Sequence, residues 1–220
     1  MAAQLPRVIA IDGPSASGKG TVAQRVAQAV GFHYLDSGAL YRLVALAAKE
    51  QGIAWTDEAA LGPLAAALPV RFEGDEIYLN QQLVTNAVRS EEAGKGASQV
   101  AVLPAVRAGL LARQKAFRTA PGLVADGRDM GSVVFPDACL KIFLTADAET
   151  RAERRYKQLI GKGMSANITA LLQDIRARDE RDSQRSTAPL QKTDDAILLD
   201  TTHLTIDAAV EAVLARYKAI

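Results

Sequence analysis

The sequence predicts an α/β protein with a parallel sheet covered by helices. Short apolar or β-branched runs alternate with longer stretches of helical spacing, which is typical of strands joined by crossover helices. Several of the short runs are apolar at consecutive positions, as expected for strands buried on both faces. Right-handed crossovers then predict a three-layer sandwich. The 220 residues correspond to one domain with room for a small insert, at about 150 residues per domain.

The elements follow in order along the chain. Strands are expected over residues 8–11, 33–35, 123–125, 140–144 and 197–199. Helices are expected over residues 19–30, 39–51, 105–119, 148–160, 168–185 and 206–217. The last helix has the clearest start, because Thr205 can cap it and Asp207 places a negative charge in its first turn.

The interval 52–100 interrupts this alternation. Three short runs, 70–72, 77–79 and 82–84, are separated by Gly74-Asp75 and Asn80-Gln81, which predicts antiparallel strands joined by tight turns. We therefore expect a core of residues 1–51 and 101–220, with an insert of residues 52–100. A surface hairpin without a binding role is an alternative that composition leaves open.

Composition excludes several classes of protein. Hydrophobic residues make up 49% and charged residues 23%, as in folded chains. The net charge of +1 gives no overall field to attract nucleic acid or an anionic membrane. The most apolar stretch, 61–70, contains two prolines and is too short to span a membrane, and the N-terminus shows no secretory signal. The single cysteine, Cys139, cannot form an internal disulfide, which suits the cytoplasm.

A Gly-x-x-x-x-Gly-Lys pattern lies between the first expected strand and its helix. Gly13 and Gly18 allow a tight loop, its N–H groups and the helix dipole attract an anion, and Lys19 adds a movable charge. A glycine-rich connection that only turns the chain would need neither Lys19 nor Thr21. We expect ATP phosphates to bind here, at Gly13, Pro14, Ser15, Ala16, Ser17, Gly18, Lys19, Gly20 and Thr21.

One residue of the loop departs from the general pattern. Gly20 stands where a Ser or Thr hydroxyl usually reaches Mg²⁺, so Thr21 or water must substitute. The Gly-Lys-Gly-Thr form resembles nucleoside monophosphate kinases more than switch GTPases or motor ATPases.

Two further clusters follow expected strands. Ser37 begins a helix whose N-terminus can hold a second anion, with Arg42 about one turn inside; an ordinary cap with a surface Arg is the alternative. After the strand 123–125, Asp126 can order Mg²⁺ through water, Arg128 can clamp a phosphate, and Asp129 can accept from an exocyclic amine. A turn closed by ion pairs would explain only part of this cluster.

A basic helical stretch predicts a lid. Arg178, Asp182 and Arg185 have the spacing of one helix face. From residue 151 to 185 basic side chains outnumber acidic ones, and the Gly161-Lys162-Gly163 break can hinge them over a phosphate. A solvated, salt-bridged helix is the usual meaning of such a pattern. The stretch 94–100, where the insert rejoins the core ahead of Arg107, is a further candidate for the acceptor site. A polar linker followed by a capped helix explains it equally well.

Together these motifs resemble bacterial cytidylate kinases. The resemblance runs nearly end to end, and its most specific part is Asp126-Gly127-Arg128-Asp129-Met130-Gly131 with the following 133–137. It implies a P-loop kinase fold with a five-stranded parallel sheet, a mobile lid around 151–185 and a small mixed α/β nucleotide-binding insert. It also implies a monomer that uses ATP with Mg²⁺ to phosphorylate CMP or dCMP.

The resemblance assigns roles to particular residues. Ser98, Arg107 and Asp129 would read the cytosine edge. This edge carries an amino group that donates to an Asp, beside acceptor atoms that accept from an Arg. Uracil has an acceptor in place of the amino group, so the Asp would have no donor to accept from. Arg178 and Asp182 would bind the sugar, and Arg154 and Arg155 the ATP. The acceptor phosphate would be held by Ser37, Arg42, Arg128 and Arg185. Thr21 and Asp126 would hold Mg²⁺, and the catalytic set would be Lys19, Arg128, Asp129, Arg178 and Arg185.

Two other functions are alternatives to this one. The first is a P-loop kinase for another small acceptor, such as shikimate or dephospho-coenzyme A. The insert and the 126–129 cluster argue against it. A nucleotide-dependent switch or nucleic-acid-binding ATPase predicts a Ser or Thr after the loop lysine, or a basic aromatic surface, whereas aromatic residues are 5%. Neither His33 nor His203 lies in a group of residues that indicates a general base. The preference between CMP and dCMP, and the tolerance for UMP, stay open.

Overall fold

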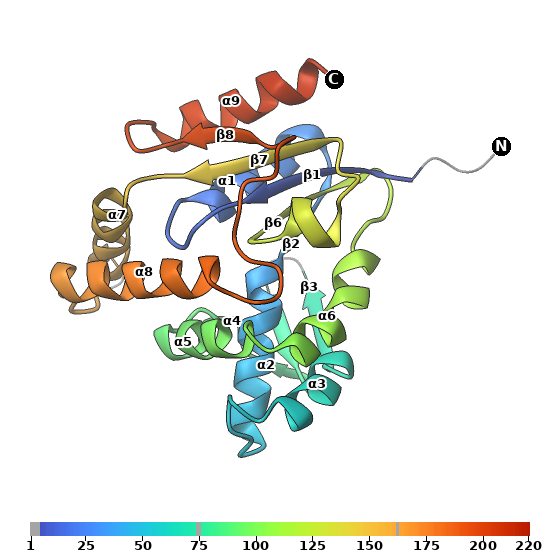
Figure 1. Cartoon of the computed structure of the whole chain (residues 1–220), viewed down its shortest axis with the longest axis vertical. Helices are drawn as coiled ribbons and strands as arrows, with labels where there is room; N and C mark the ends of the chain where they lie inside the picture. Colours follow the sequence, from blue (N-terminus) through green and yellow to red (C-terminus); the bar gives the residue numbers. More distant parts are fainter. Residues whose placement is uncertain (1–4, 74–75, 162) are drawn as a thin grey trace. The chain divides into compact units, whose positions relative to one another are not determined.

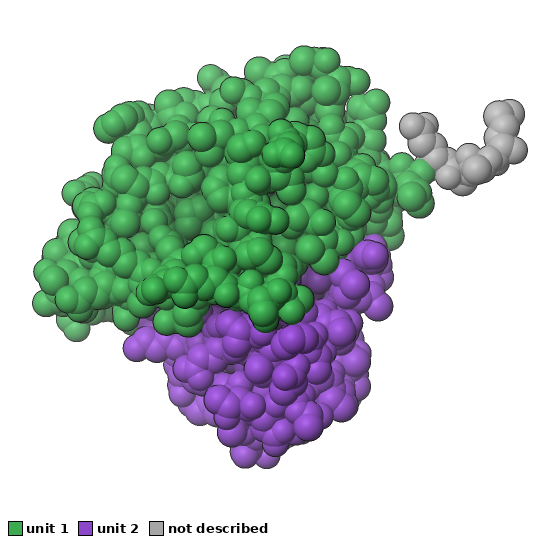
Figure 2. All heavy atoms as spheres, in the orientation of Figure 1, with its two compact units in different colours: residues 1–35, 117–220 green, residues 36–116 purple. Residues whose placement is uncertain are grey.

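The computed structural model describes residues 5–73, 76–161 and 163–220. The chain divides into two compact units, Met1–Leu35 with Phe117–Ile220, and Asp36–Ala116 (Figure 2). The expected turn at Gly74-Asp75 and the hinge residue Lys162 lie outside the described residues. Within the described ranges, no helix is long and apolar enough to cross a membrane.

A five-stranded parallel sheet forms the centre of the first unit, in the order β2-β6-β1-β7-β8 (Figure 1). Its strands are β1 (Arg7–Asp12), β2 (His33–Asp36, ending at the unit boundary), β6 (Gly122–Gly127), β7 (Leu140–Thr145) and β8 (Ile197–Asp200). The register pairs Asp12 with Gly127 on one side and with Phe143 on the other. The carboxyl ends of the three middle strands therefore meet at one edge, where open α/β sheets place their sites.

Two helices cover one face of this sheet. They are α1 (Lys19–Val30) and α9 (Ile206–Lys218), and their apolar residues join those of β1, β6, β7 and β8 in one buried cluster. As expected from the sequence, Thr205 caps α9 by accepting from Ala208 N at 3.2 Å. The unit also contains α7 (Ala148–Gly161), α8 (Ile168–Ser183) and a π-helical turn, η1 (Met130–Val134).

The second unit combines helices with a three-stranded antiparallel sheet, β3-β4-β5. Tight turn geometry joins β4 and β5, because Asn80 and Gln81 both have positive φ, 48° and 67°. Small residues let two helices approach closely, since a Cβ on Gly62 would lie 2.9 Å from Ala105 Cβ. The elements are α2 (Ser37–Glu50), α3 (Glu58–Ala66), β3 (Val70–Glu73), β4 (Glu76–Leu79), β5 (Gln82–Leu83), α4 (Thr85–Val88), α5 (Glu91–Val100) and α6 (Pro104–Ala116).

The α/β class and the five-stranded parallel sheet are confirmed, but two details of the sequence interpretation are wrong. The helix expected over 168–185 ends at Ser183, so Arg185 lies beyond it and not on its face. The chain turns back there, with Ala188 at φ 49° and Leu190 N donating to Asp182 O at 2.8 Å. The linker reading of 94–100 is also wrong, because these residues belong to α5.

Candidate active site

The loop between β1 and α1 has the geometry of a phosphate site. A Cβ on Gly13 would lie 1.9 Å from Leu144 O of β7, so only glycine fits there. Ala16 and Gly18 have positive φ, 56° and 88°, and these angles wind the loop tightly. Lys19, the first residue of α1, is buried, and its Nζ donates to Pro14 O at 3.3 Å across the loop.

Polar groups in this loop are arranged for an anion. The side-chain oxygens of Ser15 and Ser17 are buried, and neither has a hydrogen-bond partner within the part of the chain that is described. Among the described residues, no side chain caps the start of α1 by a hydrogen bond. Because buried hydroxyl groups and helix N–H groups without partners are costly, a phosphate that accepts from them fits this loop.

Asp126 lies beside the start of α1. Its carboxylate, at the end of β6, is 5% exposed and accepts from Tyr34 Oη at 2.8 Å. A Cβ on Gly20 would lie 3.8 Å from Asp126 Oδ2. Thr21, the other expected Mg²⁺ residue, is exposed. No group of three or more His, Cys, Asp or Glu residues that could hold a metal occurs in the described ranges.

Asp12, at the end of β1, ties the phosphate loop to the turn after β6. Its carboxylate accepts from Met130 N and from Gly131 N, both at 2.8 Å. Burial raises the pKa of Asp12 to about 6, and the two backbone hydrogen bonds oppose that shift only in part. Sequence reasoning missed this residue; the available signal was a carboxylate at the end of a buried strand, next to the loop.

An ionic cluster joins the turn after β6 to the end of α8. Arg128 Nε donates to Asp182 Oδ2 at 2.7 Å, and Arg185 Nε donates to Asp182 O at 3.3 Å. Burial raises the pKa of Asp182, but the charge and hydrogen bond of Arg128, with the charges of Arg178 and Arg185, lower it below its usual value. The structure thus brings four expected acceptor residues together, and Asp129, 4% exposed, follows Arg128 directly.

Arg151, which sequence reasoning did not single out, links α7 to both α8 and the phosphate loop. Its Nη1 and Nη2 donate to the two carboxylate oxygens of Asp179 at 3.0 and 2.6 Å. The same Nη1 donates to Ser15 O at 3.2 Å, and Nε donates to Ala146 O at 2.9 Å. The sequence signal was weak, because one Arg in a basic helix resembles its neighbours.

The two arginines of α7 that are expected to bind ATP have different surroundings. Arg154 Nη1 donates to Ser17 O at 3.3 Å and to Thr201 Oγ1 at 3.2 Å, while Nη2 donates to Thr201 O. Arg155 donates to Gln158 of its own helix. Arg154, like Arg151, therefore contacts the phosphate loop.

Four expected acceptor residues lie in the second unit. Ser37 begins α2 and is 3% exposed, and Ser98 of α5 is 5% exposed. Arg42 Nη1 donates to Val88 O at 3.1 Å and to Ser90 O at 3.0 Å. Arg107 of α6 lies 5.8 Å from the centre of the Tyr41 ring, and its Nη1 donates to Ala101 O at 3.2 Å.

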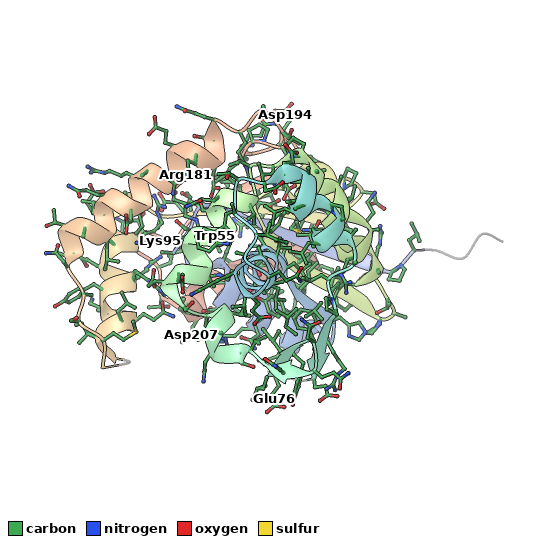
Figure 3. All side chains as sticks on the ribbon, turned by 90° about the horizontal axis from the view of Figure 1, so that it is seen from below. Trp55, Glu76, Lys95, Arg181, Asp194 and Asp207 are labelled. Atoms are coloured by element: carbon green, nitrogen blue, oxygen red, sulfur yellow. The ribbon has the colours of Figure 1, made fainter. Side chains whose placement is uncertain are left out.

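Glycines let α5 come close to α2 around these residues. A Cβ on Gly94 would lie 3.1 Å from Arg42 Nη2, and one on Gly96 would lie 2.7 Å from Ala45 Cβ and 2.8 Å from Trp55 Cζ2. Trp55, labelled in Figure 3, donates from Nε1 to Ala45 O at 3.0 Å. The glycines that suggested a linker are thus required for helix packing.

The parallel sheet, the glycine-rich loop and the basic α7–α8 region define a kinase of the P-loop class. The fold agrees with the solved structure of a gluconokinase from Sinorhizobium meliloti 1021, with a TM-score of 0.50 and 17% identity, covering 97% of this chain and 94% of that one. The family model for cytidylate kinase matches residues 9–219.

Curated relatives give the particular family. A cytidylate kinase from Chromobacterium violaceum is 64% identical over 207 residues, covering 94% of this chain and 93% of the relative. Cytidylate kinases from Pseudomonas aeruginosa and Bordetella bronchiseptica are 60% and 58% identical, and they cover 94% and 96% of this chain and 93% and 95% of their own lengths. The chain belongs to the cytidylate kinase family and is a phosphotransferase.

Proposed function

We propose that the chain transfers the γ-phosphate of ATP to CMP or dCMP, giving ADP and CDP or dCDP. The observation that carries the proposal is identity of 58% to 64% with cytidylate kinases over nearly their whole length. The loop geometry supports the donor side, and the Arg128-Asp129 turn supports the choice of acceptor.

On the donor side, the triphosphate binds to residues 13–21. The unsatisfied hydroxyl groups of Ser15 and Ser17 and the N–H groups at the start of α1 donate to its oxygens. Lys19 exchanges the Pro14 carbonyl for a phosphate oxygen. Arg154, which already lies on the loop, and Arg155 add positive charge from α7.

The residues beside the loop fit Mg²⁺. The Asp126 carboxylate is a hard oxygen donor beside Gly20, and one or two carboxylates together with phosphate oxygens are the usual ligands of nucleotide-bound Mg²⁺. Asp126, through water, and Thr21 would hold the ion. When bound, it neutralises charge on the transferring phosphoryl group.

On the acceptor side, the base, sugar and phosphate have separate residues. Ser98, Arg107 and Asp129 recognise the cytosine edge, and Arg178 and Asp182 bind the sugar. The phosphate is held by Ser37, Arg42, Arg128 and Arg185. Arg128 donates to the Asp182 carboxylate and Arg185 donates to the Asp182 backbone carbonyl in this structure, so an incoming phosphate would compete with these two acceptors.

The reaction needs no nucleophile from the protein. An oxygen of the acceptor phosphate, already largely ionised at neutral pH, forms a bond to the γ-phosphorus while the bond from that phosphorus to the β,γ-bridging oxygen breaks, and ADP leaves. Lys19, Arg128, Arg178 and Arg185 neutralise the charge, and Asp129 positions the acceptor. Catalysis is therefore positioning together with electrostatic stabilisation.

We also propose the organisation that goes with this activity. Residues 52–100 act as the nucleotide-binding insert, and residues 1–51 with 101–220 act as the kinase core, with a lid around 151–185. The enzyme works as a monomer in the cytoplasm on small nucleotides, not on nucleic acid.

The test is an assay of ADP release with Mg·ATP and several acceptors in parallel: CMP, dCMP, UMP, AMP, GMP, shikimate and dephospho-coenzyme A. We expect strong release with CMP and dCMP and little with the others. Equal activity with UMP would contradict the role of Asp129, and no acceptor-dependent release would contradict the proposed function.

A further inference from the structure

Tyr34 extends from β2 to the residue that follows the loop lysine. Its hydroxyl donates to Asp126 Oδ1 at 2.8 Å, and β2 and β6 are neighbours in the sheet (Figure 1). A Cβ on Gly20 would lie 3.5 Å from Tyr34 Oη and 3.8 Å from Asp126 Oδ2. The phenol and the carboxylate therefore face the same backbone position, the second residue of α1.

Gly20 is also where this chain departs from the general phosphate-loop pattern. That pattern has a Ser or Thr hydroxyl directed at Mg²⁺. Thr21, the substitute expected from the sequence, is exposed, whereas Tyr34 Oη and Asp126 Oδ2, which belong to other elements, lie within 4 Å of the missing Cβ. Side-chain oxygens from β2 and β6 thus lie beside the position where a Ser or Thr Cβ would stand.

The environment of Tyr34 divides its side chain into two parts. The ring packs against the apolar cluster formed by the sheet, α1 and α9, and only the hydroxyl reaches Asp126. A hydroxyl that donates one hydrogen bond still has lone pairs with which to accept from water. Removing this hydroxyl therefore changes the polar end and leaves the packing of the ring intact.

We propose that Tyr34 is a positioning residue that orients Asp126 toward Mg²⁺ and supplies the hydroxyl that Gly20 lacks. The inference rests on the proposed function, which assigns Asp126 to the Mg²⁺ of bound ATP. The hydrogen bond from Tyr34 occupies Oδ1. Oδ2 of the same carboxylate lies beside Gly20, where it would accept from the water shell of the cation.

The test compares ATP affinity with and without the cation by calorimetry. For Tyr34→Phe we expect the Kd for ATP in EDTA to stay within about twofold, while the Kd for Mg·ATP rises about tenfold, the scale of a lost hydrogen bond to a charged group. A variant that keeps the wild-type ratio of these two Kd values would overturn the proposal. Thermal melting establishes that the variant is folded.

The matched control is Tyr217→Phe. The Tyr217 ring packs against the same apolar cluster, edge-on to Phe32 at 5.8 Å, and its hydroxyl interacts with Arg7, away from the loop. This variant should keep the wild-type ratio of the two Kd values. A loss equal to that of Tyr34→Phe would mean that core packing, and not the hydroxyl near Gly20, sets the preference for Mg·ATP.

A second variant tests whether the hydroxyl itself matters. Adding Gly20→Ser to Tyr34→Phe places an oxygen at the position that the general pattern uses, where the Cβ meets only ordinary contact distances. We expect it to restore most of the lost Mg·ATP affinity, and failure to restore any would contradict the hydroxyl-supply role. If wild-type protein showed no CMP-dependent ADP release, the proposed function would fail; an active wild type with an unchanged Tyr34→Phe ratio would remove only the role of Tyr34.

Discussion

At the scale of single residues, Lys19 is held in place by its burial and by a hydrogen bond to a backbone carbonyl. It begins α1, is 9% exposed and donates across its own loop to Pro14 O. Lys19→Ala should lower kcat by about 10²- to 10³-fold, because a preorganised charge is lost from the transferring phosphate, while the fold is retained. Steady-state kinetics and circular dichroism check this. Lys218→Ala, on the exposed side of α9, is the control, and equal turnover in the two variants would contradict the assigned role.

Asp12 predicts a pH dependence of stability. Its folded pKa is about 6, whereas an unfolded Asp titrates near about 3.9. Between these values the folded state binds more protons, so this group makes the free energy of unfolding fall as pH rises from about 4 to about 6. In total the change amounts to about 3 kcal/mol.

Denaturant titrations at several pH values measure this effect. In Asp12→Asn the contribution should be absent, so the difference in unfolding free energy between wild type and variant should shrink as pH rises through this window. Asp194→Asn, a change at an exposed residue labelled in Figure 3, is the control. Parallel pH profiles for wild type and Asp12→Asn would show that Asp12 does not titrate in this range.

Sequence reasoning at this scale found the residues that belong to motifs and missed those that act through contacts. Lys19 and Asp126 were expected because a local pattern places them after a strand. Asp12, Tyr34 and Arg151 were not, because their partners lie far away in sequence; Tyr34 needs Asp126, and Arg151 needs Asp179. Only the fold brings such pairs together.

At the scale of elements, two ion pairs join α7 to α8 and offer a direct comparison. Arg151 and Asp179 form a bidentate pair with side-chain exposures of 6% and 29%, whereas Arg176 and Glu149 are 62% and 59% exposed. A Lys in place of Arg151 cannot form the bidentate hydrogen bonds to Asp179 and also donate to Ser15 O. Exposed pairs contribute little to stability.

Arg151→Lys should therefore lower the free energy of unfolding by about 1 to 3 kcal/mol. Arg176→Lys, its matched control between the same helices, should leave stability unchanged. Urea titrations of both variants measure the difference. Similar losses in the two would mean that the buried pair does not hold α7 and α8 together.

The strands and the long helices were predicted with the correct type, but their ends were less accurate, and the helices α3, α4 and α5 of the second unit were not expected. The strands are apolar at consecutive positions, and β1 runs Arg7–Asp12 against an expectation of 8–11. The predicted end of α8 was too late, because the sequence before Pro189 has no strong helix stop signal. The helix ends before a turn at Ala188 and a hydrogen bond from Leu190 N, which the sequence does not reveal. The helix α5 was missed because Gly94 and Gly96 lower helix propensity, a cost that packing against Ala45 and Trp55 offsets.

At the scale of the whole molecule, the proposed acceptor residues belong to both units, and the phosphate loop belongs to one. Asp129 lies in the first unit and Ser98 in the second. Asp129→Ala and Ser98→Ala should each weaken CMP binding by about tenfold or more, because buried polar groups on the base lose partners, and leave ATP binding unchanged. Calorimetric titrations with CMP and with ATP measure both effects. Weakened ATP binding in either variant would contradict the division of roles.

The connectivity of the two units has a consequence for synthesis on the ribosome. Residue 7 of the central strand pairs with residue 122, and residue 9 pairs with residue 140, so β1 emerges long before either neighbour exists. The second unit, Asp36–Ala116, is by contrast one continuous segment. It has all its parts before the sheet of the first unit can close. Contacts of such long sequence separation form slowly. The apolar residues of β1 and α1 therefore stay without their sheet partners until residues 122 to 140 have been synthesised, whereas every residue of the second unit is present earlier.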